Sequence, residues 1–225
     1  MTRETHLLLA RSVRSVAAAL VGVLAFGTVS HAAPAIDNSN ASVSCTSIAK
    51  GVIKARPALT ATGGTSTVLL LSGKLGGCSS PEGITFQEGR STFRAILNVT
   101  DNACAGFVGE SPTTGSITIR WKTDESLTNP ISTVTLPSGA VVGGTGTVAG
   151  GLRVTFDLGT GAPSNGAAMG ATPMSVTGGF TGGDGGASSG VTVVTQLSVD
   201  SILALCDSRK GTKEVGIGAG AVSLH

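Results

Sequence analysis

The sequence predicts an all-β fold, an antiparallel β-sandwich or partly open barrel with two disulfides and at most one short helix. Three observations support this prediction. Several segments alternate apolar and polar residues with a period of two, which buries one face of a strand and exposes the other. Clusters of glycine, proline and serine separate these segments, as turns do. The chain contains 4 cysteines, an even number that favours two disulfides.

The first 32 residues are expected to be a signal peptide. The basic segment MTRETHLLLARSVR precedes the short apolar run SVAAALVGVLAFGTV, and small residues follow at Ser30 and Ala32. This order is typical of a secretion signal, and the run is shorter than the roughly 20 residues of a membrane-spanning helix. We therefore expect cleavage after Ala32, a flexible lead-in over 33–43 and a single all-β domain over 44–225, with no membrane span in the mature protein.

Strands are expected along the rest of the chain wherever the alternation holds. Ile117–Lys122 and Leu152–Leu158 alternate without a fault. Phe93–Val99 alternates in the same way except at Ile96, which is an apolar residue at a position where the alternation calls for a polar one. Further β-rich runs are 47–56, Val68–Leu75, Ile131–Leu136, Val191–Val199 and Val215–Leu224.

One segment, Asp200–Cys206, has the pattern of a short helix. Asp200 would cap its first turn, and Ile202, Leu203 and Leu205 would pack inward. A continued strand is the alternative reading of these residues.

The first predicted hairpin indicates how the cysteines pair. Cys45 and Cys78 lie at nearly equal distances from the centre of the Ala61–Gly64 turn. Residues at equal distances from a hairpin turn face each other across antiparallel strands, within reach of a disulfide. We therefore predict a Cys45–Cys78 disulfide, which leaves Cys104–Cys206 as the second. The spacings contain no C-x-x-C, so no zinc or redox motif is indicated.

Several motifs resemble those of a group of small secreted proteins. They are LSGKLGGC at Leu71–Cys78, NAC at Asn102–Cys104, ITIRW at Ile117–Trp121, ISTV at Ile131–Val134 and GTGTVAG at Gly144–Gly150. Their order is similar to small secreted actinobacterial proteins, which tend to repeat a W…S-T-V…G-x-V-x-x-G succession. The resemblance covers most of the mature chain. It implies an exported all-β domain and transfers no catalytic residues to this sequence.

The charge of the mature chain is close to neutral. The whole chain has 15 basic and 13 acidic residues, but three of the bases and one of the acids lie in the first 32 positions. The 12 acids and 12 bases that remain are scattered. A near-neutral chain of this kind favours neither nucleic acid nor an anionic membrane surface as a partner.

The glycine-rich stretch GGFTGGDGGASSG, residues 178–190, contains a G-x-S-x-G pattern. Serine hydrolases of that pattern need a histidine base. The three histidines of the chain are His6, His31 and His225. None lies inside the mature domain, so we expect a mobile loop between two strands.

Two classes of function remain. We expect a secreted, non-enzymatic extracellular or cell-surface domain that binds an unknown extracellular ligand or envelope component, with no catalytic residue, metal, cofactor or nucleic-acid partner. The alternative is an extracellular glycan hydrolase that acts through two carboxylates. Its candidate acids are Glu82, Glu88, Glu110, Asp124 and Glu125. Trp121 is in phase with core positions, so we expect it inside the domain.

Overall fold

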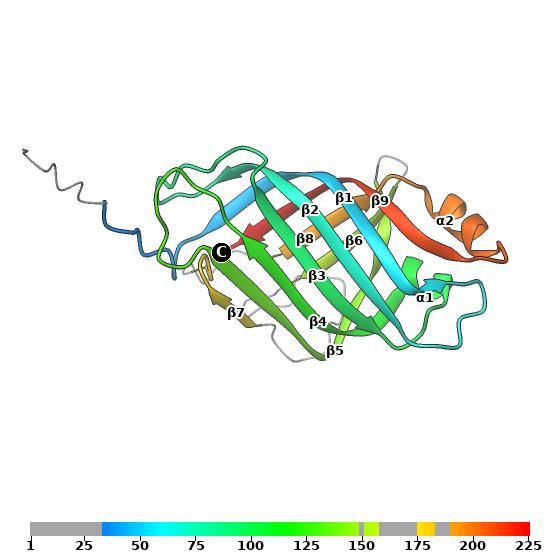
Figure 1. Ribbon diagram of the computed structural model, residues 1–225. Helices are drawn as coiled ribbons and strands as arrows, with labels where there is room; N and C mark the ends of the chain where they lie inside the picture. The colour runs from blue at the N-terminus through cyan, green and yellow to red at the C-terminus, as the bar shows by residue number, and fades with distance from the viewer. Residues whose placement is uncertain (1–32, 149–150, 158–174, 183–189) are drawn as a thin grey trace, which may run out of the picture. The chain divides into compact units, whose positions relative to one another are not determined.

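Nine β-strands form one antiparallel sheet that curls round on itself (Figure 1). A computed structural model describes residues 33–148, 151–157, 175–182 and 190–225, and the statements below concern these residues. The strands are β1 (Val43–Leu59), β2 (Thr67–Ser79), β3 (Ser91–Val99), β4 (Glu110–Arg120), β5 (Ile131–Val148), β6 (Gly151–Asp157), β7 (Ser175–Gly178), β8 (Gly190–Thr195) and β9 (Thr212–Leu224). Two short helices, α1 (Cys104–Val108) and α2 (Val199–Cys206), complete the described elements.

The strand order makes this sheet a partly open barrel. The order is β4-β3-β2-β1-β9-β8-β6-β5-β7, and an additional pairing of β4 with β5 joins the two sides. The end of β5 at Gly143–Val148 pairs with β6. The other end, at Ser132–Thr135, carries β7 instead. Of the two architectures that the sequence allows, the structure is therefore the barrel.

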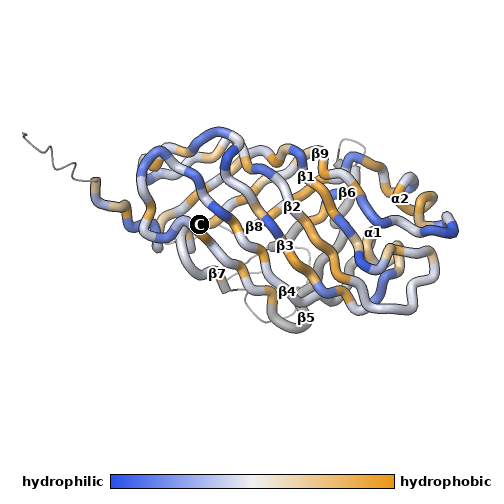
Figure 2. Tube along the Cα trace, viewed as in Figure 1, coloured by the Kyte–Doolittle hydropathy of each residue, from blue (hydrophilic) through white to orange (hydrophobic). Residues whose placement is uncertain are grey.

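The barrel interior is filled by the apolar residues of the alternating strands. Figure 2 shows apolar and polar positions alternating along the chain. The largest fully buried side chains include Leu71, Leu97, Ile117, Ile119 and Ile217, each no more than 2 % exposed. Residues at the intervening positions face solvent on the outer wall. The period of two in the sequence thus separates a packed core from a polar outer wall.

The β1–β2 hairpin has the register that the sequence predicts. Gly63 and Gly64 in its turn both have positive φ, which glycine adopts without strain. Cys45 lies opposite Cys78, and the two form a disulfide with a Cα–Cα distance of 3.9 Å. A bulge at Lys50, whose φ is 52°, shifts the register by one residue further along. The predicted Cys45–Cys78 pairing is confirmed.

Two helices at one end of the barrel are linked by the second disulfide. Cys104 of α1 and Cys206 of α2 are bonded with a Cα–Cα distance of 6.3 Å, as predicted. The expectation of at most one helix is wrong, because α1 also forms. The predicted N-cap of α2 is wrong as well. The hydroxyl of Ser198, and not the carboxylate of Asp200, accepts the hydrogen bond from the backbone N–H of Ser201 in the first turn. Leu205 does not pack inward and is 45 % exposed.

The opposite end of the barrel is covered by residues 36–42, part of the segment expected to be a flexible lead-in. Asn38 is fully buried there. Its Nδ2 donates to the carbonyl of Asn129 at 2.9 Å, and its Oδ1 accepts from the backbone N–H of Asn129 at 3.1 Å. The backbone N–H of Phe180 donates to the carbonyl of Asn38 at 2.7 Å. These bonds attach the segment to two separate parts of the chain.

An aromatic cluster lies beneath this cover. Trp121 is 2 % exposed, as expected of a core residue, and its ring centroid lies 5.0 Å from that of Phe180 in an edge-on arrangement. Phe86 contacts both rings, at 5.9 Å from Trp121 and 5.6 Å from Phe180. Such edge-on contacts favour the packing of aromatic rings beyond simple burial.

Two of the predicted segments lie outside the described residues. They are the signal peptide expected over 1–32 and the centre of the glycine-rich stretch, 183–189. In the part of the chain that is described, none of the helices has the length and apolar character needed to cross a membrane.

Candidate anion-binding face

Glu82, one of the candidate acids, fastens the β2–β3 loop to the N-terminal segment. Its Oε1 accepts a hydrogen bond from the backbone N–H of Ser42 at 3.0 Å, and the hydroxyl of Ser80 donates to its Oε2. Partial burial raises the pKa of this carboxyl, but the hydrogen bonds from Ser80 and Ser42 together outweigh it and hold the pKa below its usual 4.5. A lowered pKa keeps Glu82 ionised at neutral pH, whereas a general acid needs a raised one.

Glu88 and Glu125 have separate backbone partners. Glu88 accepts a hydrogen bond from the backbone N–H of Gly77 at 3.2 Å. Glu125 accepts one from Thr85 at 3.2 Å, and its own backbone N–H, together with that of Thr85, holds its pKa below 4.5. Asp124 is exposed, and Glu110 lies in β4 opposite Gly143. Within the described residues, no group of three or more acidic, histidine or cysteine side chains is placed to hold a metal ion.

The outer wall of β1–β4 carries basic side chains close together. In the central part of these strands, the outward positions are 52–56 in β1, 68–74 in β2, 92–98 in β3 and 114–120 in β4, taken at every second residue. They include five bases and no acid. We call these five residues the basic face: Lys54, Arg56, Lys74, Arg94 and Arg120.

The strand register brings three of these bases around one threonine. Thr92 of β3 lies opposite Lys74 of β2 on one side and Arg120 of β4 on the other. Arg94 follows two residues along β3, between Ser72 and Thr118. Diagonal neighbours on adjacent strands are about 7–8 Å apart, so Arg94 is close to both Lys74 and Arg120, which lie on opposite sides of β3.

Among the described residues, one base of the basic face has an acidic partner. Lys54 forms an ion pair with Glu214 of β9, with 3.2 Å between Nζ and Oε2. The structure shows no ion pair for the other four bases among the residues it describes. Unpaired cations at neighbouring positions repel one another, so an anion placed among them would be attracted to all of them.

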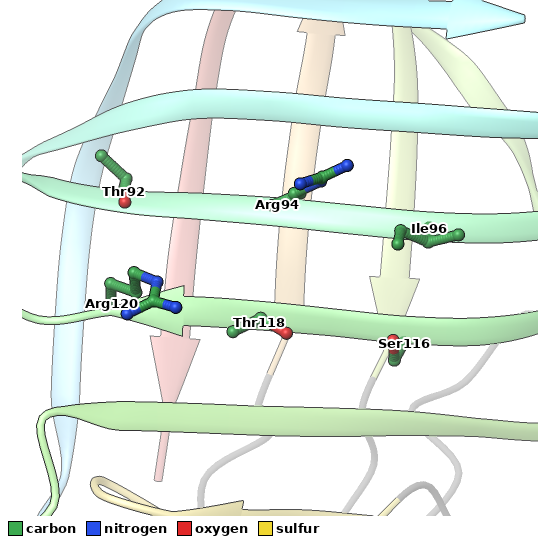
Figure 3. Close-up of a pocket in the computed structure, with 6 residues that line it drawn as sticks. All are labelled: Thr92, Arg94, Ile96, Ser116, Thr118 and Arg120. Carbon is green, nitrogen blue, oxygen red and sulfur yellow. The ribbon is translucent and has the colours of Figure 1, made fainter.

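A shallow hollow of about 390 Å³ lies between the two arginines. Figure 3 shows its lining in two rows, Thr92, Arg94 and Ile96 along β3 and Arg120, Thr118 and Ser116 along β4. The hollow thus combines two guanidinium groups with three hydroxyls, and both kinds of group donate hydrogen bonds to oxyanions. Arginine is well suited to this task because its planar guanidinium can donate two parallel bonds to one anion.

A glycine beneath the hollow lets its two strands approach. Gly115 of β4 has a φ of +151° and lies close to β3. A Cβ at this position would collide with the carbonyl oxygen of Ile96. Any other residue would therefore force β3 and β4 apart and change the spacing of the hollow.

The basic face is the feature that sequence reasoning missed. Its members are far apart in the sequence, and the mature chain as a whole is near neutral. A usable indication was nevertheless present, because Arg94 and Arg120 occupy the polar phase of predicted strands while the acids are mostly found in turns. Comparing the outward positions of all predicted strands would have shown that these bases lie on the strands and most of the acids in the turns.

Comparison of the chain with protein-family models, with curated proteins and with solved structures finds no match. The role assigned to the basic face therefore depends on the geometry and charge of this chain.

Proposed function

We propose that this chain is a secreted, non-enzymatic domain that acts outside the cell or at its surface and binds an anionic ligand through the basic face. The observation that carries the proposal is the grouping of five exposed bases on four adjacent strands, with no acid at the outward positions between them. The two disulfides are compatible with an oxidising, extracellular environment.

The barrel supplies a rigid support for such binding. Each base of the face lies on a hydrogen-bonded strand whose inward neighbours are buried, so the backbone that carries the cations is ordered before the ligand arrives. A preorganised site avoids the entropic cost of ordering a loop. The glycan-hydrolase alternative has no comparable support, because Glu82 and Glu125 bond to backbone N–H groups and have lowered pKa values.

Binding to polymers of known charge tests the proposal. The secreted chain would be titrated with polyphosphate, with polyglutamate and with neutral dextran in a calorimeter at several salt concentrations. We expect binding to the two anionic polymers, none to dextran, and an affinity that falls as salt screens the charges. The double variant Arg94→Gln/Arg120→Gln should bind much more weakly.

The matched control removes two charges elsewhere. Arg209 and Lys210 are exposed in the turn after α2, outside the basic face. Arg209→Gln/Lys210→Gln has the same net charge as the test variant, so a general charge effect would weaken both equally. Equal weakening of the two, or binding of dextran as well as the polyanions, would contradict the proposal.

A further inference from the structure

An exposed isoleucine adjoins the arginines of the basic face. Ile96 is 40 % exposed and lies at an outward position where the alternation of β3 calls for a polar residue. It follows Arg94 by two residues and lines the same hollow (Figure 3). Leu70 of β2 lies directly opposite Ile96, and Val68 follows on the same face, both half-buried. We call these three residues the apolar strip.

Because cations and aliphatic side chains lie next to each other on this wall, fewer classes of ligand fit it. A purely ionic polymer would gain nothing from contact with Ile96 and Leu70, and these residues are unfavourable in water. An amphiphile gains from both groups, because its anionic part can bind the arginines while its hydrocarbon part covers the apolar strip. Exposed aliphatic side chains next to bases are the combination that interfacial membrane binding uses.

The donors around the hollow favour a phosphate as the anionic part. Two guanidinium groups and the hydroxyls of Thr92, Ser116 and Thr118 offer more donors than the two oxygens of one carboxylate can accept. A phosphate diester carries its charge on two oxygens and has further acceptors beside them, so it can engage both arginines and a hydroxyl.

We propose that the hollow binds the phosphate headgroup of an anionic phospholipid, with Ile96 and Leu70 entering the boundary of the acyl chains. The domain then docks on an anionic membrane surface by the outer wall of β1–β4. This inference depends on the proposed function and specifies its ligand. The carboxylates of Glu82 and Glu125 lie in the loops at one end of the barrel, so an anionic surface repels that end and favours docking on the side wall.

Vesicle binding tests the inference. The secreted chain would be sedimented with phosphatidylglycerol–phosphatidylcholine vesicles and with pure phosphatidylcholine vesicles at about 0.15 M salt. We expect binding to the anionic vesicles only. Each base at an anionic surface contributes about five-fold in affinity, so Arg94→Gln/Arg120→Gln should bind about 25-fold more weakly. Arg209→Gln/Lys210→Gln is again the control.

A second pair of variants tests the apolar strip. Ile96→Thr keeps a β-branched residue at an outward strand position and should preserve the fold. We expect it to bind anionic vesicles about five-fold more weakly, because the apolar area that enters the bilayer is lost. Its control is Leu205→Gln, which removes an equally exposed aliphatic residue from α2. Circular dichroism of each variant verifies folding.

The outcomes separate this inference from the proposed function. If polyphosphate binding depends on Arg94 and Arg120 but anionic vesicles do not bind, or Ile96→Thr binds them as the wild type does, the lipid inference is wrong and the proposed function stands. Inorganic phosphate that binds alone as tightly as the vesicles would also overturn it. If neither vesicles nor polyanions bind, both proposals fail.

Discussion

The buried hydrogen bonds of Ser132 give a direct test of how the aromatic end of the barrel is held. Trp121 Nε1 donates to the hydroxyl of Ser132 at 2.7 Å, and that hydroxyl donates to the carbonyl of Gly179. Ser132 is fully buried and Trp121 is 2 % exposed. One hydroxyl therefore satisfies a buried donor and a buried acceptor on two separate segments.

Replacing Ser132 by alanine removes both bonds without adding volume. The indole N–H of Trp121 and the carbonyl of Gly179 would each lose a partner in a place that water does not reach. A buried polar group left without a partner costs about 1–3 kcal/mol. We therefore expect Ser132→Ala to lower the free energy of unfolding by about 2–6 kcal/mol, a large part of the roughly 5–15 kcal/mol typical of a domain.

The fluorescence of the chain reports on this site alone. Trp121 is the single tryptophan, and the chain contains no tyrosine. Urea unfolding followed by its emission would give the free energy of unfolding of the wild type, of Ser132→Ala and of a control, Ser116→Ala. Ser116 lies on the outer wall, where the substitution should change stability by no more than about 0.5 kcal/mol.

A Ser132→Ala variant as stable as the Ser116→Ala control would refute this reasoning. A Trp121→Phe background, followed by circular dichroism, separates the two bonds. There the indole N–H is absent, so Ser132→Ala should cost less than in the wild type. An equal cost in both backgrounds would assign the whole effect to the bond with Gly179.

Three further predictions concern the rest of the barrel. Replacing Cys104 and Cys206 by alanine should lower the free energy of unfolding by about 4–5 kcal/mol, because Cys104–Cys206 closes a loop of 102 residues. Replacing Cys45 and Cys78 should lower it by about 3–4 kcal/mol, because Cys45–Cys78 closes a loop of 33 residues. Equal losses in urea unfolding would contradict the loop-length argument. Glu82→Gln should destabilise the protein at pH 7. Hydrogen bonding lowers the folded-state pKa of Glu82, so its carboxylate stabilises the fold at pH values above the usual 4.5, and this stabilisation is lost as the pH falls through the folded-state pKa. The stabilities of wild type and variant should therefore converge once the pH falls below the folded-state pKa of Glu82, and a difference that stays constant with pH would argue against the carboxylate. Asn38→Ala should lower the free energy of unfolding by about 2–3 kcal/mol by removing two buried hydrogen bonds to Asn129. Hydrogen exchange at the backbone amide of Asn129 should become faster. Unchanged protection of that amide would show that residues 36–42 do not hold this end of the barrel.

The hairpin of β1 and β2 could be predicted from sequence because its determinants are local. The glycines of its turn fix the centre of the hairpin, and that centre fixes which residues lie opposite each other. Cys45 and Cys78 then face each other without any knowledge of the rest of the fold. The bulge at Lys50 was not predictable in this way, because its one-residue shift does not interrupt the apolar pattern strongly enough to be seen.

Helix α1 shows where local patterns fail, whereas the pattern of Asp200–Cys206 did predict α2. The five residues of α1, CAGFV, are too few to display a helical period. The disulfide from Cys104 to Cys206 and the burial of Phe107 are long-range features that a local pattern does not contain. The same applies to Asn38, whose partners at Asn129 and Phe180 are 91 residues away or more.

The basic face was hidden for a different reason. The alternation of β3 and β4 correctly indicates that Arg94 and Arg120 point outward. Which strands are neighbours depends on the topology, however, and a count of charges over the whole chain averages the bases of the wall with the acids of the loops. The net charge of the chain therefore gave no indication of this face, although the outward positions of Arg94 and Arg120 followed from the alternation of their strands.

The architecture also restricts where a ligand can bind within the described residues. The described side chains buried inside the barrel are mostly aliphatic and aromatic, so they offer few groups to a polar ligand. One end is covered by two helices tied through Cys104–Cys206, and the other by residues 36–42, where Glu82 is hydrogen-bonded to backbone N–H. On the outer wall, by contrast, four bases of the basic face have no ion-pair partner in the described chain. In the proposed function, an anion bound at the wall relieves the mutual repulsion of those bases, which favours the wall as the binding surface.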